Sequence, residues 1–135
     1  MVNSCFFDGG DVSVVVDTGP TYTYAKESAA IIKKITKKEP KIVINTHYHD
    51  DHLGGNLYYK EGGAEILGDA SIKKAYEAKP DRLERMQKLL PSEIAGKSGV
   101  ALPTRFLESN ETIKTKNGEI GLLKLSKHSH TETVS

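Results

Sequence analysis

Apolar residues change their spacing along this chain, and the spacing predicts where strands and helices lie. Short apolar runs rich in β-branched residues predict buried strands over residues 4–8, 12–19, 41–46 and 64–67. Over residues 23–38 apolar residues recur every three or four positions, at Ala25, Ala29, Ile32 and Ile35, which predicts a helix. Further helices are predicted over residues 57–61, 69–78 (with Asp69 as N-cap) and 81–90, and a loop over residues 92–103.

Strand signals return in the last third of the chain. Residues 104–125 are predicted to be β-structure, with Asn117 and Gly118 as the two-residue turn between residues 111–116 and 119–125. Strands therefore alternate with helices first and then follow one another. This order favours one α+β domain over residues 1–135, built on a mixed sheet with helices on one face. We expect the other face of such a sheet to be uncovered.

The composition excludes several functions. The chain has 135 residues, and its 19 lysines and arginines stand against 18 aspartates and glutamates, a net charge of +1. This balance argues against nucleic-acid binding by bulk charge, and no apolar run approaches the roughly 18 residues that a membrane span needs. Cys5 is the single cysteine, so no internal disulfide forms, and no histidine lies near it in sequence to activate it. Because there is no basic leader and no paired cysteine, we expect a cytoplasmic protein.

The five histidines occupy two places. His47, His49 and His52 follow the strand predicted at residues 41–46, and His128 and His130 lie near the C-terminus. In extended backbone, residues two apart project to the same side, so His47 and His49 can reach one ion together. Imidazole suits zinc and iron, and a neighbouring carboxylate such as Asp51 suits a second ion or a water. This cluster therefore predicts a metal site.

The same segment resembles the signature of a known family. His47-x-His49-x-Asp51-His52, after an apolar strand and before Gly54-Gly55-Asn56, resembles the motif of the metallo-β-lactamase-fold hydrolases. Val15-Val16-Asp17-Thr18-Gly19 is similar to that family's early strand and turn, and Ser129-His130-Thr131 is similar to its later Gly-His-Thr segment. The motif is more similar to the cyclase-like and glyoxalase-like branches than to the antibiotic-degrading enzymes. The resemblance spans nearly the whole chain and implies an αββα sandwich-like fold.

The resemblance also implies a role for each residue. His47, His49 and His130 would hold one zinc ion with a position open for water; iron and manganese remain alternatives. Asp51 would be the catalytic residue, orienting the hydroxide or ligating a second ion, and His52 would belong to the second metal site. Asp17 would steady the histidine loop from behind the ligands, unless it is only a carboxylate that ends a strand. His128 would be a surface residue, a group behind the ligands, or the ligand in place of His130.

The chain departs from this family in its extent. The family domain has two similar halves, and the bridging carboxylate and last metal-binding histidine of the second half have no counterpart before Ser135. We therefore expect a truncated domain with a weak second metal site, and a homo-oligomer that covers the exposed sheet face. The candidates for that face are Val12, Val14, Val16, Ile42, Ile44, Leu123 and Leu125. A piece of a longer polypeptide is the alternative.

Two functions follow from these expectations. The first is a zinc-dependent hydrolase that uses a metal-bound hydroxide on a small-molecule substrate, an ester, thioester, lactone or lactam, with no nucleic-acid or membrane partner. The second is a catalytically weak or inactive metal-binding half-domain that serves as an oligomerising or interaction module. Tyr58 and Tyr59 could contact substrate, but packing of their helix is the preferred interpretation.

Overall fold

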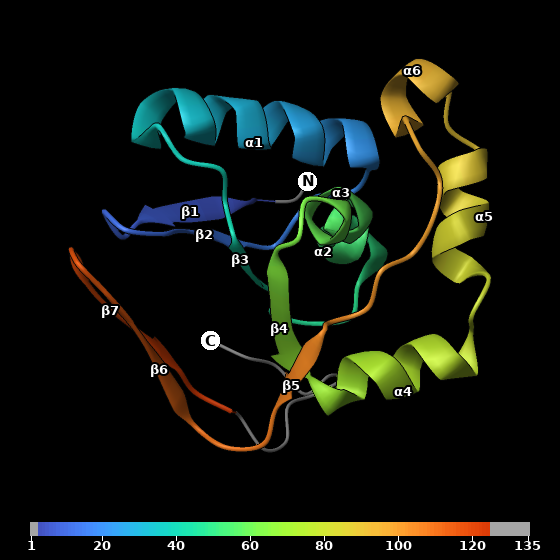
Figure 1. The fold of residues 1–135 in the computed structure, drawn as a ribbon. Coiled ribbons are helices and arrows are strands. Elements are labelled where there is room, and N and C mark those ends of the chain that lie inside the picture. Colours follow the sequence, from blue (N-terminus) through green and yellow to red (C-terminus); the bar gives the residue numbers. More distant parts are fainter. Residues whose placement is uncertain (1–2, 125–135) are drawn as a thin grey trace.

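A five-stranded mixed sheet forms the centre of the molecule (Figure 1). Its strands, in spatial order, are β1 (Cys5–Asp8), β2 (Ser13–Val16), β3 (Ile42–Ile44), β4 (Glu65–Asp69) and β5 (Arg105–Leu107). β1 runs antiparallel to β2, and the remaining neighbours are parallel. β6 (Glu111–Thr115) and β7 (Gly118–Leu122) pair as a separate hairpin. The computed structural model describes residues 3–124, so Leu125, His128 and His130 lie outside the described residues.

The helices follow the predicted order with two additions. They are α1 (Tyr22–Thr36), α2 (Asp50–Leu53), α3 (Asn56–Glu61), α4 (Ala70–Ala78), α5 (Arg82–Lys88) and α6 (Ser92–Ala95). The additions are the single-turn helices α2 and α6. Asp69 caps α4 as predicted, because its Oδ1 accepts a hydrogen bond from the Ser71 N–H at 2.8 Å. The loop predicted over residues 92–103 is wrong at its start, where α6 forms. This helix is a single turn between Pro91 and Gly96, which is too short to show a helical period.

The apolar residues of the central strands alternate between two cores. Val15, Val43 and Ile66 pack against α1 and α3 on one face of the sheet. Val14, Ile44 and Leu67 point to the other face and pack with Leu107 and Leu122. Both faces are therefore buried, which is why these strands are continuous apolar runs in the sequence.

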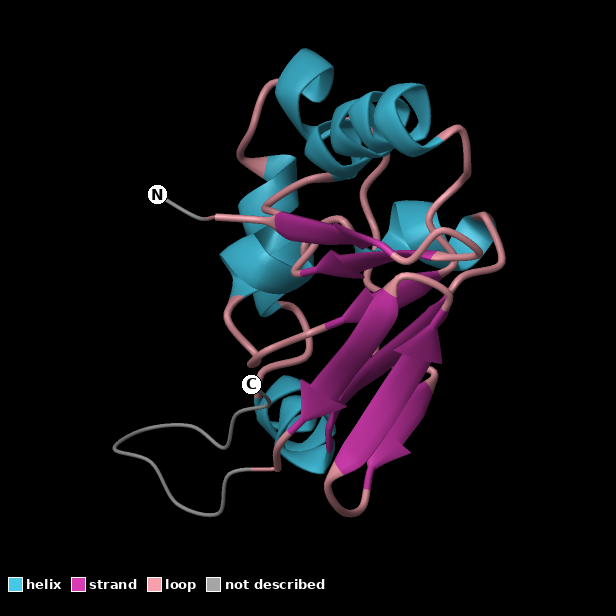
Figure 2. Cartoon of the chain, turned by 90° about the vertical axis from the view of Figure 1, so that its left-hand side faces the viewer, coloured by secondary structure: helices cyan, strands magenta, loops and turns pink. Residues whose placement is uncertain are grey.

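The expectation of an uncovered sheet face is wrong at the centre of that face. The β6–β7 hairpin covers it, so that Val14 is 0% and Ile44 3% exposed (Figure 2). Ile113 and Ile120 of the hairpin pack against this second core. Val12, Val16 and Ile42 are partly buried, and among the described candidates only Leu123 is exposed. The homo-oligomer stays a prediction, without the support that an open face would give it.

The hairpin turn lies one residue earlier than predicted. Thr115 pairs with Gly118, so the turn residues are Lys116 and Asn117. Contacts to the loop between β1 and β2 fix this register: the Asn117 N–H donates to the Gly9 carbonyl, and the Lys116 N–H donates to Asp11 Oδ1. The register thus depends on a partner more than 100 residues away in sequence. Within residues 3–124, no helix is long and apolar enough to cross a membrane.

Candidate metal centre

The histidine loop begins where β3 ends, beside the end of the parallel strand β2. The carboxyl ends of parallel strands meet at one edge of a sheet, which is where such folds display functional groups. Two backbone hydrogen bonds join the segments there, from the Asp17 N–H to the Ile44 carbonyl at 2.8 Å and from the Thr18 N–H to the His52 carbonyl at 3.0 Å. Residues from two distant parts of the sequence therefore share one site.

The first two histidines of the motif meet. His47 Nε2 lies 3.1 Å from His49 Nδ1, and the ring centres of His47 and His52 are 4.1 Å apart. Two nitrogens bound to one tetrahedral zinc at the usual bond lengths are about 3.3 Å apart. Burial lowers the pKa of His47 below its usual 6.5, with a further contribution from His52, so the metal-binding neutral form is favoured. The pair has the spacing of two ligands of one ion.

Asp17 holds this cluster from behind. Its carboxylate is 4% exposed and accepts hydrogen bonds from the Thr46 N–H at 2.8 Å and the Thr46 hydroxyl at 2.7 Å. It also lies 2.7 Å from His52 Nδ1. Asp17 has a φ of 58°, a left-handed conformation that aspartate adopts more readily than most residues and that turns the side chain toward the loop.

This network fixes the tautomer of two histidines. The single proton of the Thr46 hydroxyl goes to Asp17, so Thr46 Oγ1, 2.8 Å from His47 Nδ1, can only accept a hydrogen bond from that nitrogen. Asp17 likewise accepts the proton of His52 Nδ1. The Nε2 lone pairs of both rings are left for a ligand, which is how proteins commonly orient metal-binding histidines.

Three residues offer ligand atoms close to one another. Asp17, His47 and His52 each place one such atom within 4.8 Å of the others. Because the oxygens of Asp17 already accept the hydrogen bonds described above, we assign Asp17 to orienting the ligands rather than to binding an ion. Asp51 lies at the rim, with its Oδ1 3.9 Å from His52 Nε2 and its side chain 47% exposed. The described donor set, imidazoles with a carboxylate beside them, fits zinc or iron.

Two glycines allow the loop to lie this close to β2. A Cβ on Gly54 would come within 1.9 Å of the Pro20 carbonyl oxygen, and one on Gly55 within 2.3 Å of the Thr18 carbonyl oxygen. Only glycine permits such an approach of backbone to backbone. The Gly-Gly pair after the histidines thus keeps α2 and α3 against the turn that carries Asp17.

A buried amide network supports the same turn, and sequence reasoning did not predict it. Asn56 donates to Asn45 Oδ1 at 2.7 Å and to the Ala101 carbonyl at 2.9 Å, and it accepts from the Asn45 amide at 3.0 Å and from the Thr18 hydroxyl at 2.8 Å. Both asparagines are fully buried. Sequence reasoning also missed Thr46, and its one available signal was its place directly before His47.

A salt bridge fastens the outer side of the loop. Asp50 Oδ2 lies 2.7 Å from Nε of Arg82, which begins α5. The Asp50 side chain is 16% exposed, so the pair is partly shielded from water. Of the predicted site residues, the structure thus brings together His47, His49, His52 and Asp17, with Asp51 at the edge. His130 and His128 lie outside the described residues.

Comparison with known proteins places these features in context. A sequence model described as the metallo-beta-lactamase superfamily matches residues 1–133. A hydroxyacylglutathione hydrolase of Nostoc punctiforme is 31% identical over 87 residues, which are 57% of this chain and 31% of that protein.

Solved structures show the same fold. A metallo-beta-lactamase from Pontibacter korlensis superposes with a TM-score of 0.72 at 17% identity, covering 96% of this chain and 51% of that one. The di-iron-bound form of TTHA1623 superposes with a TM-score of 0.66 at 20% identity, covering 97% of this chain and 59% of that one. The chain covers 31% to 59% of the length of these relatives.

Proposed function

Because this chain belongs to the metallo-β-lactamase superfamily, we propose that it is a zinc-dependent hydrolase of a small thioester or ester, with its metal held by the histidine loop. The observation that carries the proposal is the hydrogen-bond network of Asp17 and Thr46 with the histidines. It leaves the Nε2 lone pairs of His47 and His52 for an ion, and His47 Nε2 lies 3.1 Å from His49 Nδ1. A divalent ion there supplies Lewis acidity, which polarises a carbonyl and acidifies water.

Residues of this chain would hold the ion and orient the attacking water. His47 and His49, with His130 from the later segment, would hold the ion, and His52 would contribute to a second, weaker position. Asp51, whose Oδ1 lies 3.9 Å from His52 Nε2, would accept a hydrogen bond from the attacking water and orient it. Asp17 acts through Thr46 and His52 and so positions the ligands without touching substrate.

The choice of substrate class follows a relative. The Nostoc punctiforme protein is named as a hydrolase of hydroxyacylglutathione, which is a thioester. We extend that class to this chain because the matching residues cover 57% of it. Iron in place of zinc is the alternative that the di-iron form of TTHA1623 supports.

Turnover of a glutathione thioester by the zinc-loaded protein tests the proposal. We expect hydrolysis above the rate of free zinc, and we expect Asp51→Ala to lose it while retaining bound zinc. Asp81→Ala, which alters an exposed aspartate in a salt bridge with Arg85, is the matched control and should keep full activity. A protein that binds zinc but hydrolyses no thioester, ester or lactam would overturn the hydrolase and favour the non-catalytic metal-binding module.

A further inference from the structure

A small cavity lies between α1 and the strands β1 and β2, apart from the histidines. Its volume is about 160 Å³, and its walls include Phe6, Val15, Ile31 and Ile32. Asp17 and Thr18 also border it, but His47, His49 and His52 do not. Nothing in the proposed hydrolysis uses this space.

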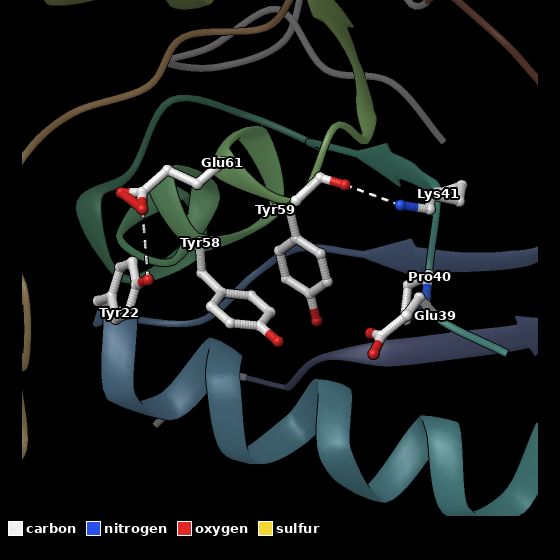
Figure 3. A pocket seen from close by; sticks show the side chains of 8 residues that line it. Tyr22, Glu39, Pro40, Lys41, Tyr58, Tyr59 and Glu61 are labelled. Carbon is white, nitrogen blue, oxygen red and sulfur yellow. Dashed lines mark hydrogen bonds between the residues drawn. The ribbon is translucent and has the colours of Figure 1, made fainter. Parts of the chain in front are cut away.

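Two hydroxyl groups on its walls are buried without a hydrogen-bond partner among the described residues. They belong to Ser4 and to Tyr59, whose side chain is 2% exposed. Figure 3 shows the Tyr59 ring reaching from α3 toward α1 with its hydroxyl at the far end. Buried hydroxyls almost always have a partner in folded proteins, so two around one cavity indicate a missing polar group.

A neighbouring cavity has one of these two hydroxyls, that of Tyr59, but not that of Ser4. Tyr59 also borders a larger space of about 400 Å³ beside Tyr22 and Lys41 (Figure 3). There Tyr22 bonds Glu61, and Lys41 donates to the Gly62 carbonyl at 2.7 Å. Because those groups are already paired, the larger cavity gives no comparable indication of a ligand.

The walls of the small cavity define the chemistry of an occupant. Most of the surface that these walls present is apolar, although several lining residues carry hydroxyl groups, and the Asp17 oxygens are taken by Thr46 and His52. A charged molecule would lose part of its hydration there, and Asp17, the charged side chain among the lining residues, is already paired. A dry cavity of about 150 Å³ is known to hold one benzene molecule, so the available space suits a single six-membered ring.

We propose that this cavity binds a small uncharged molecule, an apolar body about the size of one ring carrying a hydroxyl that exchanges hydrogen bonds with Tyr59 and Ser4. Phenol has this composition, and benzene is the matched molecule without the hydroxyl. The proposal concerns metal-free as well as metal-loaded protein, so it stands or fails independently of the hydrolase.

An NMR titration of the metal-free protein with phenol tests it. We expect saturable shifts at Val15 and Ile32, and none at Leu107 on the opposite face of the sheet. Tyr59→Phe should weaken phenol binding about two- to tenfold, the usual effect of one hydrogen bond, and leave benzene binding unchanged. Tyr58→Phe is the control, since Tyr58 borders only the larger cavity, and it should bind phenol normally.

Cys5 gives a second readout. It is exposed, lines the cavity and is the chain's single cysteine, so saturating phenol should slow its reaction with a thiol reagent. Unchanged phenol affinity in Tyr59→Phe, or shifts spread over the whole protein, would overturn the proposal. The proposal would also be overturned if the cavity held only ordered water that phenol, at the limit of its solubility, failed to displace.

Discussion

Replacement of Asp17 is the sharpest test of how the loop is held. Its buried carboxylate contacts Thr46 twice and His52 once, all within 2.8 Å. Asp17→Ala removes these contacts and leaves the Thr46 N–H without its acceptor in a part of the structure that water reaches poorly. Asp17→Asn keeps the shape and tolerates the left-handed backbone, but it removes the charge.

The magnitude follows from these contacts. Hydrogen bonds to a charged group contribute about 1.5–3 kcal/mol each, and leaving a buried polar group without its partner costs about 1–3 kcal/mol. The His52 side chain is 20% exposed and regains some hydration, which lowers the total. We therefore expect Asp17→Ala to lower the free energy of unfolding by about 3–4 kcal/mol, and Asp17→Asn by about 1–2 kcal/mol.

Urea unfolding in the presence of a chelator measures this without any contribution from bound metal. Hydrogen exchange of the Thr46 amide should accelerate in both variants, and zinc affinity should fall about 10- to 100-fold. Asp81→Ala, at an exposed pair, should stay within about 0.5 kcal/mol of the unaltered protein. Unfolding free energy and Thr46 exchange that do not change in Asp17→Ala would refute the reasoning.

Three further predictions concern the loop and the sheet edge. Thr46→Val should weaken zinc binding about tenfold by releasing the His47 tautomer, whereas Thr46→Ser should not; equal affinities by calorimetry would contradict this. Gly54→Ala should lower the unfolding free energy by about 1–3 kcal/mol in urea, since its Cβ would strike the Pro20 carbonyl, and no loss would be contrary evidence. Arg105 lowers the pKa of Glu111 below its usual 4.5. The stabilisation of the folded protein by the Arg105–Glu111 pair should therefore be present above pH 4.5 and fade as pH falls further. The difference in urea midpoint between the unaltered protein and Glu111→Gln should shrink as pH falls below 4.5. A difference that stays constant would contradict this prediction.

Local patterns in the sequence predicted the elements that depend on near neighbours. The helical spacing of Ala25, Ala29, Ile32 and Ile35 predicted α1. The first three are buried in the core as expected, but Ile35 is exposed, so its place on the buried stripe was wrong. The spacing of His47 and His49 predicted that the two rings meet, and their nitrogens lie 3.1 Å apart. Both results follow from backbone geometry over a few residues.

Contacts between distant segments could not be predicted in this way. The Asn56 network joins residues 11 to 45 positions apart, and a single sequence gives no pattern for such pairs. Sequence reasoning did not predict that the β6–β7 hairpin packs on the second face of the sheet, for a similar reason. Ile113, Ile120 and Leu122 alternate with polar residues, which indicates a half-buried hairpin but not the surface on which it packs.

The central claim is that the histidine loop and the later histidine segment hold one divalent ion. Zinc affinity and stoichiometry, measured by competition with a chromophoric chelator, test it most directly on the unaltered protein, His49→Ala and His128→Ala. We predict one tightly bound zinc per chain, lost in His49→Ala and retained in His128→Ala. Full occupancy at unchanged affinity in His49→Ala would contradict the claim.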